Sequence, residues 1–553
     1  MTNKIKGKTY LNGLIDAIYY INTNTLILKM CGILAYIKAI NDVSVFVKNL
    51  QFLNARGPDN SRSKIYDTEN IMLGFTRLSI NDLTLNGMQP MTLNEDVWMI
   101  CNGEIFNHKE LQEKYGILCK TKSDCEIILH LYEKLGSFKQ TTACLDGEFA
   151  IVLYDHKKNI VYATRDRYGV RPLFVGKLNE GYGFSSEVKA INDFQNVKQI
   201  IPGTIMEIYT LNMDIFIRSY NLVPYNQVYT QKNKTITFED DICISINETL
   251  NRAVEKRLMS DRPICCLLSG GLDSSLIAAL VAKHYPEYTL KTFSIGFKGS
   301  PDLHYANVVA KHIKSIHYCI ELSEEQFLEN IRTTIKMIES YDTTTVRASV
   351  GNMLVAKFIK ENTDCKVVFN GDYSDEVCGG YKYFYNAPNP LSFHEECKRL
   401  VSDICYFDSL RSDRSISGNG LEARVPFADN DFVSLYQSIP PELRMPTVDR
   451  IEKYLLRKAF DDGNLLPDEI LWRKKEAFSD GVSKPEKSWH KTIQEYVNKL
   501  VSDDEIKNSN LSKESFFYKK IFDEEYPNKS TVIPYYWMPK WCGYVKDPSA
   551  REI

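Results

Sequence analysis

The feature that most restricts the fold of this chain is a run of alternating strand and helix patterns between residues 264 and 369. Short apolar runs at 264–268, 291–297 and 316–322 alternate with helical patterns at 274–284, 305–313 and 324–338. This alternation predicts a doubly wound parallel sheet with helices on both faces. Such a sheet binds ligands beyond the carboxyl ends of its strands.

The chain before this sheet has a different pattern. Residues 31–216 contain many short strand-like runs and few helical segments, which predicts a layered α+β domain. A polar stretch without clear period follows, and the region after 381 is predicted to be largely helical. We expect an extension at 1–30, a first domain at 31–216, a linker at 217–238 and a second domain at 239–553. Two domains suit a chain of 553 residues.

Composition excludes several classes of protein. Lys and Arg number 68 against 71 Asp and Glu, so no charge excess points to nucleic acid or an anionic membrane as partner. No apolar stretch approaches the roughly 20 residues of a membrane span. The 14 cysteines include no CxxC pair and favour reduced thiols. We therefore expect a cytoplasmic protein whose partners are small molecules, and we leave a homodimer open.

The strongest local motif is SGGLDSS at 269–275, where a predicted strand ends and a helix begins. Gly270 and Gly271 permit a tight turn, while Ser269, Ser274 and the helix N-terminus offer hydrogen bonds to an anion. Neither GxxxxGK[ST] nor GxGxxG is present, which excludes the Walker and Rossmann loops. A capped turn explains SGG alone. The whole run after a buried strand favours a phosphate site.

A second polar segment, NGDYSDE at 370–376, also follows a predicted strand. Parallel strands place their carboxyl ends at one edge, so Asp375 should lie near Asp273. Carboxylate oxygens are the ligands that Mg²⁺ prefers. We predict a magnesium site on these two residues, although an isolated acidic turn is more often solvated loop.

A third group of motifs begins at Cys31 and includes RGPD at 56–59, RLSI at 77–80 and NGEIFN at 102–107. A cysteine nucleophile needs a base and donors for the oxyanion, and no histidine is obviously placed for the first task. Each residue alone has a simpler explanation. A lone Cys is more often a small core residue, and Asn-Gly is more often a hairpin turn.

Residues 31 to the end resemble the glutamine-hydrolysing asparagine synthetases. The resemblance covers about 520 residues, and its motifs occur in the family's order. They are RGPD, RLSI, NGEIFN, LDGEFA, RDRYGVRPLF, SSEVKA, SGGLDSS, YDTTTVRAS, GLEARVPFAD, RKKEAFSDGV and DPSAR. The family implies an N-terminal-nucleophile αββα domain, a class II glutamine amidotransferase, joined to an α/β ATP pyrophosphatase-type synthetase domain with a helical C-terminal part.

The resemblance also implies the glutaminase site. Cys31 is the nucleophile, and its own α-amino group is the base, because in the family this cysteine is the first residue. The oxyanion hole is the Asn102 side chain with the Gly103 N–H. The residues expected to bind glutamine are Arg77, Leu78, Ile80, Asn102, Gly103, Glu104 and Asp124. An amino-acid substrate suits one fixed guanidinium and at least one fixed carboxylate.

For the synthetase site the resemblance implies ATP as substrate, Mg²⁺, and an ammonia passage between the domains. The expected product is L-asparagine, made from L-aspartate through β-aspartyl-AMP, with AMP, diphosphate and L-glutamate released. Asp372 and Lys475 would act near the reacting centre. The residues expected to bind ATP are Leu267, Ser269, Gly270, Gly271, Asp273, Ser274, Ile295, Asn370 and Gly371. Those expected to bind aspartate are Thr344, Thr345 and Arg347.

Two features depart from the family pattern. The acidic segment usually reads SGEGSDE, so Asp372 replaces a glutamate and Tyr373 replaces a glycine. A displacement of a catalytic group by about 1 Å can lower the rate about a hundredfold, so the shorter Asp372 side chain predicts a slower synthetase reaction or a different acceptor. Thirty residues also precede Cys31, and an amide nitrogen is not a base. Either translation begins at Met30, which we favour, or the extension is cleaved, or glutaminase activity is absent.

Two other functions stay open. One is a related adenylating amidotransferase or lactam-forming cyclase with another carboxylate acceptor. Retention of Cys31, Arg77, Asn102 and Asp124 argues against the cyclase, since relatives that cyclise usually lose the cysteine. The other is a catalytically idle nucleotide-binding regulator, which would bind ATP without releasing pyrophosphate.

Overall fold

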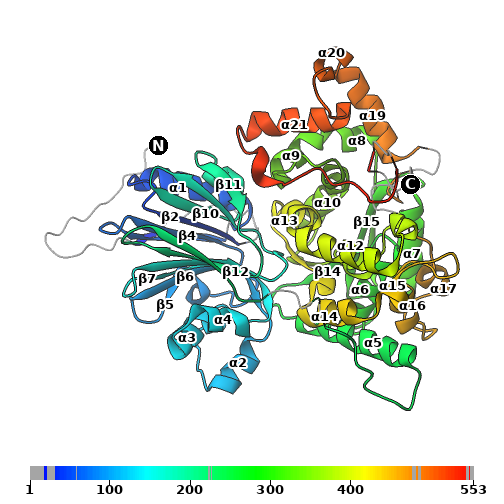
Figure 1. Cartoon of the computed structure of the whole chain (residues 1–553), viewed down its shortest axis with the longest axis horizontal. Helices are drawn as coiled ribbons and strands as arrows, with labels where there is room; N and C mark the ends of the chain where they lie inside the picture. The colour runs from blue at the N-terminus through cyan, green and yellow to red at the C-terminus, as the bar shows by residue number, and fades with distance from the viewer. Residues whose placement is uncertain are drawn as a thin grey trace.

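The computed structural model describes residues 31–57, 59–221, 225, 227–475, 481–483, 487–543 and 547–548, together with the backbone of 18–20. Two lobes lie side by side and follow one another along the chain (Figure 1). The expected extension, 1–30, lies outside the described residues except for β1, Ile18–Tyr20, whose backbone pairs with β3.

The first lobe contains two antiparallel sheets that pack face to face. One has the order β1, β3 (Asn60–Tyr66), β4 (Ile71–Arg77), β2 (Gly32–Ile37), β10 (Gly181–Ser185), β9 (Phe174–Leu178), β11 (Gln195–Gln199). The other has the order β13 (Asp214–Ser219), β12 (Thr204–Tyr209), β8 (Ile160–Arg165), β7 (Gly147–Asp155), β6 (Val97–Ile105), β5 (Met91–Thr92). Helix α1 (Val43–Gln51) covers the first sheet, and α3 (Glu126–Leu135) and α4 (Phe138–Cys144) cover the second.

Burial along the strands explains this layering. Every residue of β2 is buried, because the strand is covered on both faces. Ile33 and Ala35 belong to the apolar cluster between the sheets, whereas Leu34 and Tyr36 belong to the cluster that includes Phe46 of α1. Alternate side chains of a strand point to opposite faces, so both faces of this sheet are apolar. The expected αββα arrangement is confirmed.

The second lobe is built on a five-stranded parallel sheet. Its order is β16 (Ile316–Leu322), β15 (Lys291–Phe297), β14 (Ile264–Leu267), β17 (Val367–Phe369), β18 (Glu422–Arg424). The chain therefore runs outward in one direction from β14 and then in the other from β17. Between β14 and β17 lies the switch point at which open α/β sheets bind ligands. The doubly wound prediction is confirmed.

The helices of this lobe agree with the sequence patterns, with local differences. They include α5 (Phe238–Lys256), α6 (Leu272–Ala282), α7 (Pro301–His312), α10 (Thr343–Asn362), α11 (Ser374–Cys378), α12 (Pro390–Asp403), α13 (Asp408–Ser417), α14 (Asn430–Ser438), α16 (Tyr454–Ala459), α19 (Trp489–Leu500) and α21 (Lys513–Glu525). The helix predicted at 324–338 is divided at Asn330 into α8 (Glu324–Glu329) and α9 (Ile331–Ile338). Strand β18 lies in the region predicted to be helical, and β13 continues past the expected domain end at 216.

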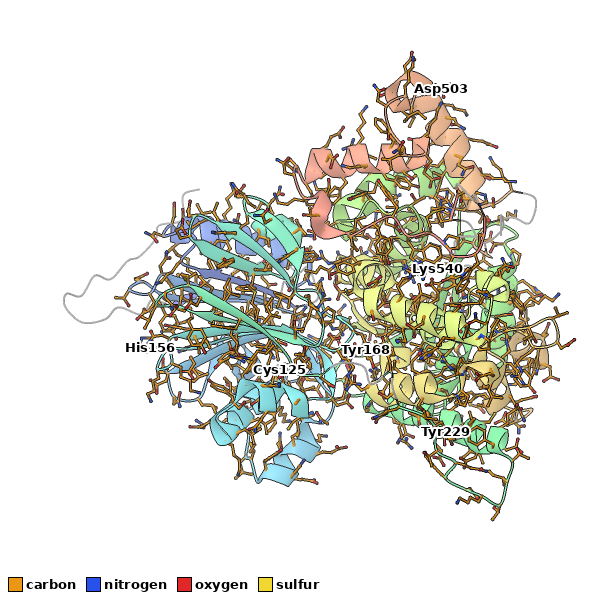
Figure 2. The ribbon with its side chains drawn as sticks, in the orientation of Figure 1. Cys125, His156, Tyr168, Tyr229, Asp503 and Lys540 are labelled. Atoms are coloured by element: carbon orange, nitrogen blue, oxygen red, sulfur yellow. The ribbon has the colours of Figure 1, made fainter. Side chains whose placement is uncertain are left out.

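The two lobes share a buried boundary. Tyr168 of the first lobe lies at this boundary (Figure 2) and belongs to the same apolar cluster as Phe427 and Phe432 of the second. Buried ion pairs also cross it, such as Arg257 Nε with Glu148 Oε1 at 2.8 Å. Within the described part of the chain, no helix is both long and apolar enough to cross a membrane.

Candidate functional site

The loop after β14 forms one wall of a cavity of about 250 Å³. Ser269 Oγ lies 2.9 Å from Ser274 Oγ, and the Ser269 N–H also donates to Ser274 Oγ at 3.1 Å. Helix α6 begins here with Gly271 as its N-cap and without a side-chain cap. Its first N–H groups and dipole are therefore available to an anion.

Two glycines let the loops around this cavity approach each other. Gly270 has φ of +75°, and a Cβ there would lie 2.4 Å from the backbone N of Ala306. A Cβ on Gly371 would lie 2.6 Å from the backbone N of Ser274. Registers between β14 and β17 bring the two loops to the same edge, as the motifs predict.

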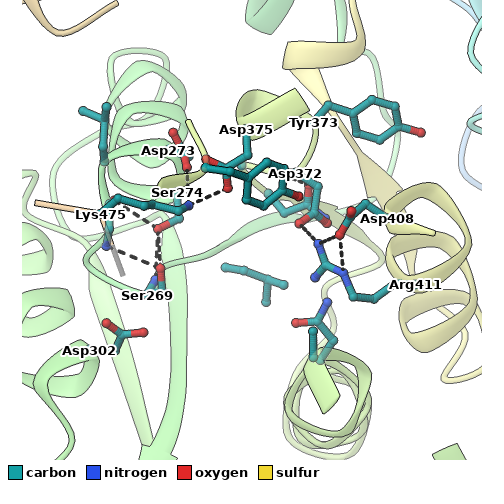
Figure 3. Close-up of a pocket in the computed structure, with 18 of the residues that line it drawn as sticks. Ser269, Asp273, Ser274, Asp302, Asp372, Tyr373, Asp375, Asp408, Arg411 and Lys475 are labelled. Carbon is teal, nitrogen blue, oxygen red and sulfur yellow. Dashed lines mark hydrogen bonds and ion pairs between the residues drawn. The ribbon is translucent and has the colours of Figure 1, made fainter. Parts of the chain in front are cut away.

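Two carboxylates and two lysines meet between these loops, and Figure 3 shows Asp273, Asp375 and Lys475 of this group. Lys453 Nζ lies 2.7 Å from Asp273 Oδ1 and 2.6 Å from Asp375 Oδ1. Lys475 Nζ lies 2.5 Å from Asp375 Oδ2 and 3.4 Å from Asp273 Oδ2. Although burial acts to raise the pKa of Asp375, the two ammonium groups hold that pKa well below its usual value. Asp375 is therefore a charged acceptor at neutral pH.

These carboxylates also fit a divalent cation. Their Oδ1 atoms converge on a single ammonium group, Lys453 Nζ, so the two oxygens can reach one ion. Hard oxygen donors of this kind suit Mg²⁺, which keeps several waters and takes phosphate oxygens as further ligands. The residues expected to hold magnesium are thus brought together, and lysines now occupy the same oxygens.

The segment after β17 is fixed to α13. Asn370 Nδ2 donates to Ser412 Oγ at 2.9 Å, and Asp372 Oδ1 pairs with Arg411 at 2.7 Å. Arg411 also pairs with Asp408 at 2.8 Å. The second carboxylate oxygen of Asp372 is buried and has no hydrogen-bond partner among the described residues. This oxygen is a free acceptor at the edge of the cavity.

The remaining predicted synthetase residues also line the cavity, but some have other partners. Leu267 and Ile295 supply an apolar wall. The Thr344 and Thr345 hydroxyls donate to Asp342, the N-cap of α10, at 2.7 and 2.8 Å. The Arg347 guanidinium is engaged with two carboxylates, Glu514 at 2.6 Å and Asp547 at 2.7 Å. In this structure Arg347 therefore offers no free donor pair to an aspartate carboxylate.

Cys31 lies in the first lobe, where β2 begins. Its Sγ contacts the main chain of Leu78, with 3.4 Å to the Leu78 oxygen and 3.4 Å to the Leu78 nitrogen. Burial raises the pKa of the thiol to about 12. Cys31 is therefore a neutral thiol near pH 7 and needs a base to become a nucleophile.

The two residues predicted to bind the oxyanion lie on β6. The Asn102 side chain is buried, and its Nδ2 has no hydrogen-bond partner in the described part of the protein. Gly103 has φ of +149°, and a Cβ there would lie 2.0 Å from the Glu148 carbonyl oxygen. A buried amide donor without a partner costs free energy unless a ligand accepts from it. This observation points to a ligand oxygen beside Asn102.

Arg77 is buried and donates to main-chain oxygens of the 81–84 turn, including Asn81 at 3.4 Å. These carbonyls orient the guanidinium without neutralising its charge. A free carboxylate is the group that would complete this site. Leu78 faces Cys31, whereas the carbonyl of Ile80 accepts from Asp261 N–H of the second lobe at 3.0 Å.

Glu104 and Asp124 are the two buried carboxyl groups of this site. Burial, followed by the nearby Asp124 charge, raises the pKa of Glu104 well above its usual value. Burial also raises the pKa of Asp124, whose Oδ2 accepts from the Ile105 N–H at 2.6 Å. Two carboxyls that resist ionisation together are suited to bind one ammonium group.

Comparison with known families separates the same two parts of the chain. A family model described as a glutamine amidotransferase domain matches residues 30–236, and one described as asparagine synthase matches 245–395 and 388–542. The Homo sapiens protein named asparagine synthetase [glutamine-hydrolyzing] is 42% identical over 557 residues, which cover 95% of this chain and 98% of that protein. The Gallus gallus and Mus musculus proteins of that name are 41% identical with the same coverage.

The chain belongs to the glutamine-hydrolysing asparagine synthetases. Among solved structures, a glutamine phosphoribosylpyrophosphate amidotransferase from B. subtilis covers 46% of this chain at 17% identity and a TM-score of 0.31. The aligned part is 64% of the amidotransferase chain, and a TM-score this low adds nothing to the family assignment.

The structure adds two charged residues to the sites predicted from motifs. Lys453 bridges Asp273 and Asp375, and Arg411 holds Asp372. Neither Lys453 nor Arg411 lies in the sequence motif that contains the aspartates it contacts. Lys453 has φ of +58° and is 1% exposed at its side chain. A lysine in a left-handed backbone conformation is uncommon, but sequence alone does not reveal φ.

Proposed function

We propose that this chain makes L-asparagine from L-aspartate, ATP and ammonia derived from glutamine, and releases AMP, diphosphate and L-glutamate. It is thus a carbon–nitrogen ligase with glutamine as nitrogen donor. The observation that carries the proposal is the presence, in one chain, of a buried Asn102 amide without a partner among the described residues and of an anion-binding loop at the switch point of the second sheet. The first suits amide hydrolysis and the second suits adenylation.

In the glutaminase reaction we propose, the α-amino group of Cys31, as the first residue, accepts the thiol proton. Sγ then attacks the amide carbon of glutamine. The Asn102 Nδ2 and Gly103 N–H donate to the oxyanion that forms. Ammonia leaves, and water hydrolyses the thioester to L-glutamate. Arg77 would bind the substrate carboxylate, with Glu104 and Asp124 binding its ammonium group.

In the synthetase reaction we propose, the β-carboxylate of aspartate attacks the α-phosphorus of ATP and diphosphate leaves. The 269–275 loop would hold the departing diphosphate, with Lys475 and Lys453 offsetting its charge. Ammonia then attacks the β-aspartyl carbonyl of β-aspartyl-AMP and displaces AMP. Asp372 would accept the proton that ammonia loses, through the oxygen that has no partner among the described residues.

Magnesium belongs to this proposal as a cofactor held by Asp273 and Asp375. When bound, it would neutralise phosphate charge. Replacing Asp375 with Asn should weaken Mn²⁺ binding, measured by the paramagnetic relaxation of water, in the presence of a non-hydrolysable ATP analogue. Equal Mn²⁺ affinity in the variant would contradict this assignment.

The division of the chain is also part of the proposal: residues 31–216 as the glutaminase, 217–238 as the linker and 239–553 as the synthetase. The extension at 1–30 would be absent from the glutamine-using form. All 14 cysteines are free thiols, which supports our proposal of a reducing, cytoplasmic compartment. A homodimer is an assembly that gel filtration can test.

Labelled aspartate tests the proposed reaction most specifically. With ¹⁸O in both oxygens of the β-carboxylate, adenylation predicts one label in AMP and one in asparagine. If ¹⁸O reached AMP from another labelled carboxylate substrate and aspartate did not react, the result would favour the related amidotransferase or cyclase. ATP binding without release of pyrophosphate would favour the idle regulator and would sink the proposal.

A further inference from the structure

Tyr373 occupies a backbone conformation that a large side chain rarely adopts. Its φ is +77° and ψ is −16°, and the residue is 2% exposed. Aromatic residues are uncommon in this left-handed region, so surrounding contacts must hold Tyr373 there. Tyr373 is among the residues that line the cavity, but its ring extends away from Asp273 and Asp375, whereas the side chain of its neighbour Asp372 points toward Arg411 (Figure 3).

The ring is seated at the boundary of the two lobes. It belongs to the apolar cluster that contains Leu78, Ile80 and Tyr168 of the glutaminase lobe, and Cys31 packs against the same cluster. The Tyr373 hydroxyl is hydrogen-bonded to Ser409 of α13. The tyrosine therefore fixes the 370–374 loop to α13 and to the apolar cluster that both lobes share.

One helix holds this loop at three points. Ser409, Arg411 and Ser412 of α13 contact Tyr373, Asp372 and Asn370, respectively. The Asp372 carboxylate is short, so its reach depends on the backbone more than that of a glutamate would. Asp372 lines the cavity, and its Oδ2 is buried and has no partner in the part of the chain that the structure describes. Because Tyr373 fixes the backbone of this loop, it also sets the position of the Asp372 carboxylate oxygen.

We propose that Tyr373 is a positioning residue for Asp372, and that the tyrosine and the shorter carboxylate form a matched pair in place of the Glu-Gly of the family motif. The inference rests on the proposed function, in which Asp372 accepts a proton from the attacking ammonia. It makes the pair interdependent: each member works with its present partner and less well with the residue usual in the family.

The test compares Tyr373→Gly, Asp372→Glu and the double variant in the form that begins at Cys31, because this is the form proposed to hydrolyse glutamine as well as to make asparagine. We expect Tyr373→Gly to lower kcat for ammonium-dependent asparagine synthesis about a hundredfold, the loss that a misplacement near 1 Å produces. KM for ATP should change little, because the ring extends away from Asp273 and Asp375 and from the 269–275 loop (Figure 3). The double variant should recover much of the lost rate, so the two effects should not multiply.

Controls separate positioning from a general loss of structure. Tyr288 also has positive φ, +59°, but is 61% exposed, so Tyr288→Gly makes the same change away from both sites and should leave both rates unchanged. Tyr373→Phe keeps the ring and loses the Ser409 contact, and should cost less than Tyr373→Gly. If Tyr373→Gly fails to fold, Tyr373→Phe still tests whether the contact with Ser409 affects the rate of synthesis. Glutamate formation from glutamine should remain at the wild-type rate in each variant.

Three results would overturn the inference. They are a normal ammonium-dependent kcat in Tyr373→Gly, single effects that simply multiply in the double variant, or glutaminase activity that falls in parallel with synthesis. A wild-type protein that makes no asparagine from ammonium would instead overturn the proposed function, and this role of Tyr373 with it.

Discussion

At the residue scale, Asn102 is the most informative side chain of the glutaminase site, because its buried Nδ2 has no partner in the described part of the protein. Replacing it with Ala should lower glutamine hydrolysis by about 10²–10³-fold, the usual cost of removing one oxyanion donor. Asparagine synthesis from ammonium should continue at the wild-type rate. Glutamate and asparagine formation by amino-acid analysis checks both, with Asn212→Ala, an exposed loop substitution, as control. Unchanged hydrolysis would contradict the oxyanion assignment.

Glu104 gives a prediction about pH. Burial and then Asp124 raise its pKa in the folded state, so folding favours the protonated form and opposes ionisation. Its contribution to stability is therefore full below the unfolded pKa, about 4.3, and is lost as pH rises above that value. The Gln side chain of Glu104→Gln is neutral at every pH. The melting temperature of the variant, relative to that of the wild type, should therefore rise between pH 5 and pH 8. A difference that is constant, or that shrinks as pH rises, would refute this account.

Much of both sites is predictable from sequence at this scale, because the groups stand in short motifs at strand ends. Cys31, Asn102 and Asp273 lie where their motifs indicate. Lys453 is separated from Asp273 by 180 positions and has no motif to connect them, so only the fold brings the charges together. Sequence also could not reveal that Arg347 is already paired with Glu514 and Asp547.

At the scale of elements, two adjacent glycines in the turn between β14 and α6 have different roles. We expect Gly270 to matter for stability and Gly271 for anion binding. A Cβ at Gly270 would meet Ala306 N at 2.4 Å in a left-handed backbone, whereas at Gly271 the nearest atom is Ser269 Oγ at 3.4 Å. Gly270→Ala should lower the free energy of unfolding by at least about 1 kcal/mol from the backbone alone.

The companion variant Gly271→Ala should keep its stability and lose pyrophosphate release, because the added methyl group enters the anion site. Urea unfolding together with a pyrophosphate assay distinguishes the two variants. Equal loss of stability in both would show that the turn is only structural.

Element order was predictable because strand and helix periods differ, and α6, α7 and β14–β17 lie close to their predicted positions. Shorter features were not. β18 has three residues and pairs with β17 only after a long excursion of the chain. The division between α8 and α9 at Asn330 depends on local backbone angles and leaves the helical period almost intact.

At the scale of the whole molecule, buried charges join the lobes. Arg257 Nε lies 2.8 Å from Glu148 of the glutaminase lobe, and Arg257 Nη1 lies 2.8 Å from Asp429 of the synthetase lobe. Breaking a buried ion pair costs about 3–5 kcal/mol, and the loss here should lie toward the lower end, because Glu148 keeps Arg171 and Asp429 keeps Lys256 as partners. Arg257→Ala should lower unfolding stability by this amount.

A matched arginine on the surface is the control for this prediction. Arg332 is 54% exposed and pairs with Glu524 at 2.7 Å, so Arg332→Ala should cost no more than about 1 kcal/mol. Similar losses in the two variants, measured by urea unfolding, would mean that the buried charges do not join the lobes energetically. No sequence pattern predicts these pairs, since both partners lie far apart in the chain.

The central claim is that one chain hydrolyses glutamine at Cys31 and uses the ammonia at the synthetase site. It is tested most directly with two preparations, one beginning at Met1 and one at Cys31, each given aspartate, Mg-ATP and either amide-¹⁵N glutamine or ammonium. We predict that both make asparagine from ammonium, and that only the Cys31 form transfers ¹⁵N from glutamine. Equal transfer by an intact Met1 form, or no asparagine from either form, would contradict the account.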